Sequence, residues 1–123
     1  MNAVLEQPLV EQFREPDTPY LSPALIGDFF GFQVQELAER AHVHRNTPTA
    51  RPQAPQLQKY LQDMVRVLAA AAQITGDKQR AAFLLRNEPL RAFSYKTADA
   101  LIQEGRADAL IAYLESLAGG SAG

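Results

Sequence analysis

The clearest pattern in the chain is an apolar stripe that runs through residues 55–74. Apolar residues recur there every three or four positions, which is the spacing that places side chains on one face of an α-helix. The stripe consists of Leu57, Tyr60, Leu61, Met64, Val65, Leu68, Ala71 and Ala72. It predicts one long helix that begins near Pro55 and is ended by the Gly76-Asp77 pair.

Two shorter helices are predicted before this stripe. Ser22-Pro23 is a helix start, because serine accepts a hydrogen bond from a free backbone N–H and proline at the first position loses none. A helix over 23–30 then turns Leu25, Ile26, Phe29 and Phe30 inward, and Gly31 ends it. A second helix over 33–41 places Val34, Leu37, Ala38 and Ala41 on one face.

Three more helices are predicted after the stripe. One spans 78–87, with Ala81, Ala82, Leu84 and Leu85 inside, and Pro89 stops the chain from continuing it. The next is capped by Thr97, runs through about Glu104 and is ended by Gly105. The last spans 107–117 and forms a hairpin with the helix before it. Every periodic segment is helical, so the expected class is all-α: a small helical domain with a C-terminal helical hairpin.

Residues 1–21 contain Pro8, Pro16 and Pro19 and no sustained periodicity, so we expect an extended or disordered arm. Leu5, Leu9, Val10 and Phe13 leave open a short helix that docks on a partner. The expected organisation is therefore a flexible arm over 1–21, a region with the long helix over 22–76, and a C-terminal unit over 77–123.

The long helix also predicts self-association. In a chain of 123 residues each of the other helices must bury its own apolar face. We therefore expect them to cover only part of the stripe between Leu61 and Leu68, and a second copy to cover the rest. The expected state is a homodimer with this helix in or beside the interface.

Composition narrows the classes of protein further. The chain has no cysteine, so disulfides and thiolate metal sites are excluded, which fits a reducing cytoplasm. No apolar run approaches the roughly 20 residues that span a bilayer. We expect a cytoplasmic protein without a membrane partner. The net charge is −2, but residues 33–76 carry five basic against three acidic side chains and form the only positive segment.

This positive segment contains a pattern typical of a helix-turn-helix, which needs a small buried residue, a permissive turn residue and a polar start to the second helix. Ala38 fits the buried position, His42 the turn and Val43 the apolar contact that follows. Pro48 and Pro52 interrupt the second helix, which should be short or distorted. The motif is therefore degenerate.

The candidate DNA-binding residues follow from this motif. Arg45 and Asn46 are placed to contact bases, and Arg51 and Lys59 to contact phosphates. The full set is His44, Arg45, Asn46, Thr47, Thr49, Arg51 and Lys59. A scaffold that no longer binds DNA is the alternative, because an excess of two positive charges is also typical of an ordinary solvated surface.

No pattern in the chain indicates catalysis. His42 and His44 are two positions apart, which is not the spacing of a helical zinc pair, and no acidic residue or cysteine completes a site. The serines lack the sequence context of a nucleophile, and the glycines are too few for a phosphate loop. We expect no enzyme activity, no metal and no cofactor.

The last third of the chain carries the most specific signal. Asn87-Glu88-Pro89-Leu90, Phe93, Lys96 through Ile102 and Gly105-Arg106 precede an apolar stretch from Leu110 to Leu114 and the end Gly119-Gly120-Ser121-Ala122-Gly123. This string resembles the toxin-binding domain of the Xre/MbcA/ParS-type antitoxins, the partners of RES-domain toxins. The resemblance covers about residues 22–120 and extends to Leu37-Ala38 and to Val43 through Thr47.

The resemblance implies a type II antitoxin that occludes the active site of a RES-domain, NAD-degrading toxin and represses its own operon by binding operator DNA. The small-residue end would enter the mouth of the toxin's active site. The implied toxin-binding residues are Arg91, Lys96, Arg106, Tyr113, Ser116, Gly119, Gly120 and Ser121. Phe83 falls where the family often has tryptophan and is expected to be a buried aromatic.

Two other readings remain open. The same fold would suit a helix-turn-helix transcriptional regulator or adaptor without a toxin partner. It would also suit a structural protein without DNA contact, if Pro48 has destroyed the second helix. A small-residue tail is by itself also typical of plain disorder.

Overall fold

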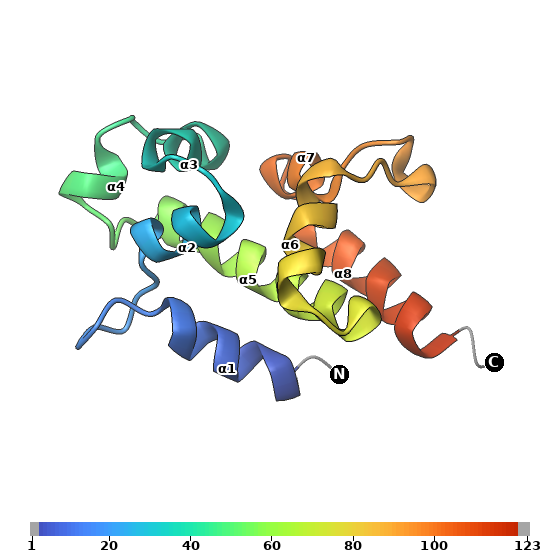
Figure 1. Ribbon diagram of the computed structural model, residues 1–123. Helices are drawn as coiled ribbons and strands as arrows, with labels where there is room; N and C mark the ends of the chain where they lie inside the picture. Colours follow the sequence, from blue (N-terminus) through green and yellow to red (C-terminus); the bar gives the residue numbers. More distant parts are fainter. Residues whose placement is uncertain (1–2, 121–123) are drawn as a thin grey trace.

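The computed structural model describes residues 3–120, and its regular elements there are helices and short helical turns (Figure 1). The long helix α5 crosses the middle of the molecule, and the other helices pack around it. The elements are α1 (Ala3–Phe13), α2 (Pro23–Phe30), α3 (Val34–Ala41), α4 (Thr47–Ala50), α5 (Pro55–Thr75), α6 (Lys78–Asn87), η1 (Arg91–Phe93), α7 (Ala98–Gln103), α8 (Ala107–Glu115) and η2 (Ser116–Gly120). The prediction of an all-α fold is confirmed.

Helix α5 forms where the apolar stripe predicts it. Pro55 is its first residue and loses no hydrogen bond there, and Gly76 ends it in the left-handed conformation with a φ of 76°. Leu57, Leu61 and Leu68 have no exposed surface at all. One continuous core of buried side chains, from Leu9 in α1 to Leu114 in α8, is organised around this helix.

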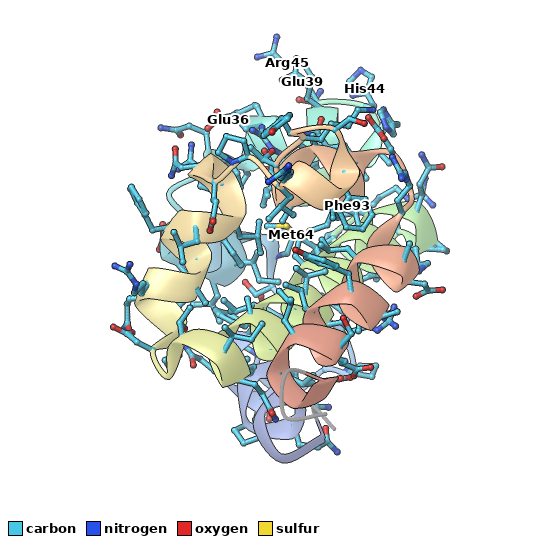
Figure 2. All side chains as sticks on the ribbon, turned by 90° about the vertical axis from the view of Figure 1, so that its right-hand side faces the viewer. Glu36, Glu39, His44, Arg45, Met64 and Phe93 are labelled. Atoms are coloured by element: carbon cyan, nitrogen blue, oxygen red, sulfur yellow. The ribbon has the colours of Figure 1, made fainter. Side chains whose placement is uncertain are left out.

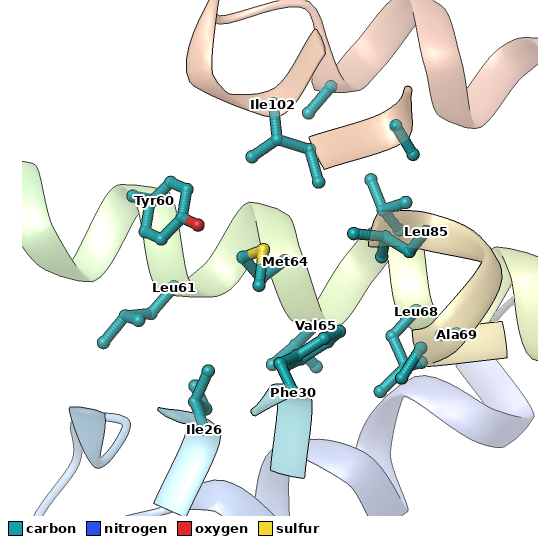
Figure 3. Close-up of a cluster of buried hydrophobic side chains, with 14 of the residues drawn as sticks. Ile26, Phe30, Tyr60, Leu61, Met64, Val65, Leu68, Ala69, Leu85 and Ile102 are labelled. Atoms are coloured by element: carbon teal, nitrogen blue, oxygen red, sulfur yellow. The ribbon is translucent and has the colours of Figure 1, made fainter. Parts of the chain in front are cut away.

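The chain's own helices cover the stripe of α5. In Figure 3, Ile26 and Phe30 of α2 lie on one side of Met64, while Leu85 of α6 and Ile102 of α7 lie on others. Helices α1 and α8 also pack along α5. The expectation that the other helices cover only part of the stripe is therefore wrong, and a second copy is not needed to bury it.

The N-terminal segment is a helix, which corrects the expectation of an extended or disordered arm. Helix α1 contains Pro8 and packs on α5, with Leu9 and Phe13 exposed by only 4% and 1%. A turn follows, closed by a hydrogen bond of 2.7 Å from the Ser22 N–H to the Phe13 carbonyl oxygen. The prolines concealed this helix because they disfavour it locally, whereas burial against α5 stabilises it. The helix docks on its own chain.

The predicted start and stop signals bound α2. The Ser22 hydroxyl accepts a hydrogen bond of 3.1 Å from the Leu25 N–H, and Gly31 ends the helix with a φ of 81°. Gly27 allows the following chain to approach closely. A Cβ at this position would lie 2.7 Å from the Phe32 carbonyl oxygen, so only glycine fits without a shift.

The C-terminal helices follow their predicted signals, with one correction. The Thr97 hydroxyl accepts from the Ala100 N–H at 3.1 Å, and Gly105 has a φ of 78° between α7 and α8, which pack as a hairpin. Phe83 is not a buried aromatic: 64% of its surface is exposed. The reason is helical phase, because Ala82 and Leu85 occupy the face of α6 that meets the core.

A charged joint connects α3 to α7. The Arg40 guanidinium donates two hydrogen bonds of 3.1 Å to the Asp99 carboxylate, and both side chains are mostly buried. The guanidinium also lies 4.0 Å from the centre of the Phe32 ring, where Arg86 of α6 makes a second cation–π contact at 4.2 Å. Burial, reinforced by the Asp99 charge, raises the pKa of the nearby Tyr60 phenol far above its usual range. The regions 22–76 and 77–120 are thus parts of one packed unit.

Candidate partner-binding surfaces

Helices α3 and α4 pack against each other as a pair. Ala38 is 1% exposed, and its carbonyl oxygen accepts a hydrogen bond of 3.0 Å from the Val43 N–H. His42 ends α3 with a φ of 61°, so it takes the left-handed turn position that the sequence assigns to it. Val43 is half-buried against the core, in the expected apolar role.

The second helix of this pair is one turn long. Helix α4 begins at Thr47, not at His44, and ends at Ala50. Pro48 lies in its first turn and is buried, which is compatible with a helix start but leaves no room for a longer helix before Pro52. The prediction of a short second helix is confirmed. A recognition helix of ordinary length is absent from the described part of the chain.

The predicted DNA-binding residues around α4 divide into exposed and structural ones. Arg45, Thr49 and Arg51 are exposed, and neither arginine forms an ion pair within residues 3–120. His44 accepts a hydrogen bond of 3.1 Å at Nδ1 from the Asn46 N–H, and Thr47 is half-buried. Some polar groups of this turn therefore stabilise the turn itself.

Lys59 is committed to a neighbour on its own helix. Its ammonium lies 2.9 Å from Oδ1 of Asp63, a carboxylate whose side chain is only 8% exposed. Arg66 binds the same oxygen at 3.2 Å. A phosphate contact by Lys59 would remove one of the two cations that pair with this buried carboxylate. Lys59 is therefore less available to bind phosphate than an unpaired surface lysine would be.

Acidic side chains also lie on the surface formed by α3 and α4. Glu36, Glu39 and Arg45 line one shallow hollow with a volume of about 380 Å³, and Figure 2 shows Glu39 beside Arg45 at the top of the view. The surface around α3 and α4 is therefore mixed in charge and not a uniform basic stripe.

A compact loop forms a second surface between α6 and α7. Residues 90–96 fold back on themselves through the turn η1, and Leu90 and Lys96 form an isolated bridge. The Leu90 N–H donates to the Lys96 carbonyl oxygen at 2.9 Å, and the Tyr95 N–H donates to the Leu90 carbonyl oxygen at 2.8 Å. Both ends of the loop are thereby tied together, and the loop has a single defined path.

Several predicted toxin-binding residues meet at the base of this loop. The Phe93 ring meets the Tyr113 ring edge-on at 5.5 Å, and the Arg106 guanidinium lies 5.4 Å from the Phe93 ring centre. Lys96 hydrogen-bonds to Glu104, whose other oxygen lies 3.5 Å from Arg106. These contacts, the Lys96 hydrogen bond first, lower the pKa of the Glu104 carboxyl below its ordinary value.

The structure thus brings Lys96, Arg106 and Tyr113 together around Phe93, with Arg91 exposed in the same loop. The remaining predicted residues lie beyond α8. The Ser116 hydroxyl donates to the Tyr113 carbonyl oxygen at 2.7 Å, and Gly119 and Gly120 belong to the π turn η2. Ser121 lies outside the described residues.

An apolar groove lies close to this surface, between α5, α6 and α8. Its volume is about 210 Å³, and Ile74, Leu84, Leu90, Tyr113 and Leu117 are among the residues that line it. Ile74 and Leu117 are each 45% exposed at its rim. Five large hydrophobic side chains are exposed among the described residues, and four of them belong to the segment 74–117; two of these, Ile74 and Leu117, line the groove.

Sequence reasoning missed three residues of this region. Tyr95 and Glu104 belong to the loop and its ion network, and Asp99 joins α7 to α3. The helical period says nothing about Tyr95, because a loop has no period. The ion pair of Asp99 with Arg40, 59 positions away, leaves no signal in the local sequence.

Comparison with known proteins adds no relative. No family model, no curated protein and no solved structure matches the chain. Among the described residues, no three potential metal ligands come together. Within the same range, each helix is too short or too polar to cross a bilayer.

Proposed function

We propose that this protein is a type II antitoxin that binds a RES-domain, NAD-degrading toxin through the region from α6 to η2. The observation that carries the proposal is the exposure of Phe83, Tyr95 and Leu117 in that region, together with the apolar groove that Leu117 lines. Such exposed apolar surface on a small fold is typical of a protein-binding surface. It coincides with the part of the chain where the resemblance to the Xre/MbcA/ParS-type antitoxins is strongest.

The mode of inhibition follows from the resemblance and from local chemistry. The turn η2 continues α8 with small residues, and a side chain at Gly119 would meet no neighbour within 4 Å. A segment without bulky side chains fits a narrow catalytic cleft. We propose that the chain after Leu117 occludes the toxin's active site while the groove and the loop 90–96 hold the toxin's surface.

Growth rescue tests this function. The protein is co-expressed with the product of the neighbouring gene, which the proposal requires to be a RES-domain protein, and the two are purified together. We expect rescue of growth and a stable complex. Deletion of residues 118–123 should abolish rescue and retain the complex, because α8 ends at Glu115 and the groove stays intact. Full rescue by the truncated protein would contradict occlusion, and no complex with the full chain would contradict the antitoxin proposal.

Operator binding is a second proposed activity. Its support is the helix–turn–helix packing of α3 on α4 and the unpaired, exposed Arg45 and Arg51. A gel shift with the DNA upstream of the gene tests it, both for the free protein and for the complex with the toxin. No sequence-specific shift in either state would leave an antitoxin without repression.

The alternative is a regulator or adaptor without a toxin. It shares α3 and α4 with the first proposal but gives no role to the apolar groove. Specific DNA binding together with failure to bind the product of the neighbouring gene would favour it.

A further inference from the structure

We propose that Tyr95 is the anchor of the partner-binding surface and that the loop 90–96 is built to hold it out toward an acidic protein partner. The inference rests on the proposed function and specifies which side chain of that surface binds. Tyr95 is the most exposed large hydrophobic residue among those described, at 65%. Tyrosine is enriched among the residues that dominate protein interfaces, since its ring buries a large area with few rotatable bonds.

The backbone under Tyr95 is in an unfavourable conformation. Ser94 has a φ of 57° and Tyr95 a φ of 65°, so two successive residues with a Cβ occupy the left-handed region. A bulky side chain rarely adopts it, and glycine or asparagine would do so at lower cost. Nothing in the core requires a tyrosine here, because its side chain points into solvent. Strain of this kind marks positions where function outweighs stability.

The rest of the loop compensates for this strain. Tyr95 donates its N–H to Leu90 at 2.8 Å, and Lys96 donates its own to Phe93 at 3.1 Å. Phe93 packs edge-on against Tyr113 of α8. The loop is therefore preorganised, and an exposed ring on a preorganised loop loses little conformational freedom when it binds.

The charge around Tyr95 defines the partner. Arg91, Lys96 and Arg106 lie in or beside the loop, and the Glu104 carboxylate pairs with the latter two. Arg91 forms no ion pair within residues 3–120. This net positive charge favours an acidic surface that also offers a pocket for an aromatic ring.

A nucleic acid fits this surface less well than a protein does. A strand of phosphates needs several free cations along its path. Here two of the three cations are already paired, and Glu88 lies on the rim of the adjoining groove. A protein with one acidic patch needs only the unpaired Arg91 beside the ring.

Two glycine variants separate the ring from the backbone. Tyr95→Gly removes both the ring and the strain, and Ser94→Gly removes strain alone. Calorimetric binding to the purified product of the neighbouring gene, the partner tested by growth rescue, gives the Kd, and thermal unfolding gives the Tm. We expect Tyr95→Gly to raise or keep the Tm and to weaken binding by about 30-fold, as for an interface hot spot. Ser94→Gly should raise or keep the Tm and leave the Kd within about threefold.

The possible results distinguish failure of the Tyr95 anchor from failure of the antitoxin proposal. A loss of less than about tenfold for Tyr95→Gly, with tight binding by the unmutated protein, overturns the anchor and leaves the antitoxin proposal standing. No binding by the unmutated protein overturns both. Tyr95→Asn, which also tolerates the left-handed region, decides in place of Tyr95→Gly if that variant unfolds. Binding of a labelled single-stranded oligonucleotide that disappears in the Tyr95 variant overturns the protein partner.

Discussion

The α3–α4 end and the loop 90–96 both carry candidate residues but use them differently. Around α4, His44 and Lys59 are engaged with neighbours in their own segment, and acidic side chains lie beside Arg45. In the loop, internal contacts leave Arg91 and Tyr95 exposed, next to an apolar groove. The presence of polar residues in the sequence does not distinguish a surface that supports its own fold from one that is free to bind. The contacts of each side chain in the structure make this distinction.

The largest expected effect is the loss of the hydrophobic core that supports both surfaces. Leu61 of α5 has no exposed surface, so Leu61→Asp buries an unpaired carboxylate and should destabilise the fold by more than about 4 kcal/mol. Circular dichroism should show an unfolded chain and not a folded monomer released from a dimer. Leu117→Asp is the matched control: at 45% exposure it should leave the melting temperature nearly unchanged. A folded Leu61→Asp protein would contradict the central role of α5.

The ion pair between Arg40 and Asp99 tests whether the two surfaces are independent, because it connects α3 to α7. Asp99→Ala leaves the Arg40 guanidinium without its partner in a mostly buried site, and we expect a loss of about 2–4 kcal/mol in chemical denaturation. Arg40→Ala in the same background should cost much less than it does alone. Additive costs for the two substitutions would show that the pair does not join the regions.

The α3–α4 surface is tested by its two free arginines. If it binds DNA, Arg45→Ala should cost about 1–3 kcal/mol at the operator, and Arg51→Ala should reduce the salt slope by about one. Neither substitution should alter stability by more than about 0.5 kcal/mol, because both side chains are exposed. Toxin binding that falls with Arg45→Ala would contradict the separation of the two surfaces.

The smallest expected effect concerns the ion network of the loop. The pKa of Glu104 is lowered in the folded protein, so its contribution to stability is complete above the unfolded pKa of about 4.3. It is lost as pH falls through the lower, folded value. The melting temperature should therefore fall slightly on acidification below that range, and Glu104→Gln should remove this component. An equal pH dependence in the variant would assign it to other carboxylates.

Sequence reasoning succeeded where one residue determines local structure. Ser22, Gly31, Thr97 and Gly105 fix helix ends through their own hydrogen bonds or backbone angles, so α2, α7 and their neighbours were predictable. It failed where the decisive contact is distant. Helix α1 depends on α5 for its stability, and the exposure of Phe83 depends on which face of α6 meets the core.

The same distinction applies to the candidate surfaces. The sequence marked Lys96, Arg106 and Tyr113, and the structure brings them together around Phe93. No local pattern specifies that Ser94 and Tyr95 take left-handed angles, because neither residue type favours them. The closure of the loop imposes those angles.

The way α1 docks on α5 suggests which helix unfolds first. This helix reaches α5 only after a turn through residues 14–22, and its neighbours along α5 are distant in sequence. It therefore gains its contacts late in folding, after the chain that connects it has been ordered. We expect it to open first, so that its amides exchange with solvent ahead of those in α5. We expect each such opening to expose apolar surface at Phe13 and along α5, so that the docked helix shields the folded protein from aggregation.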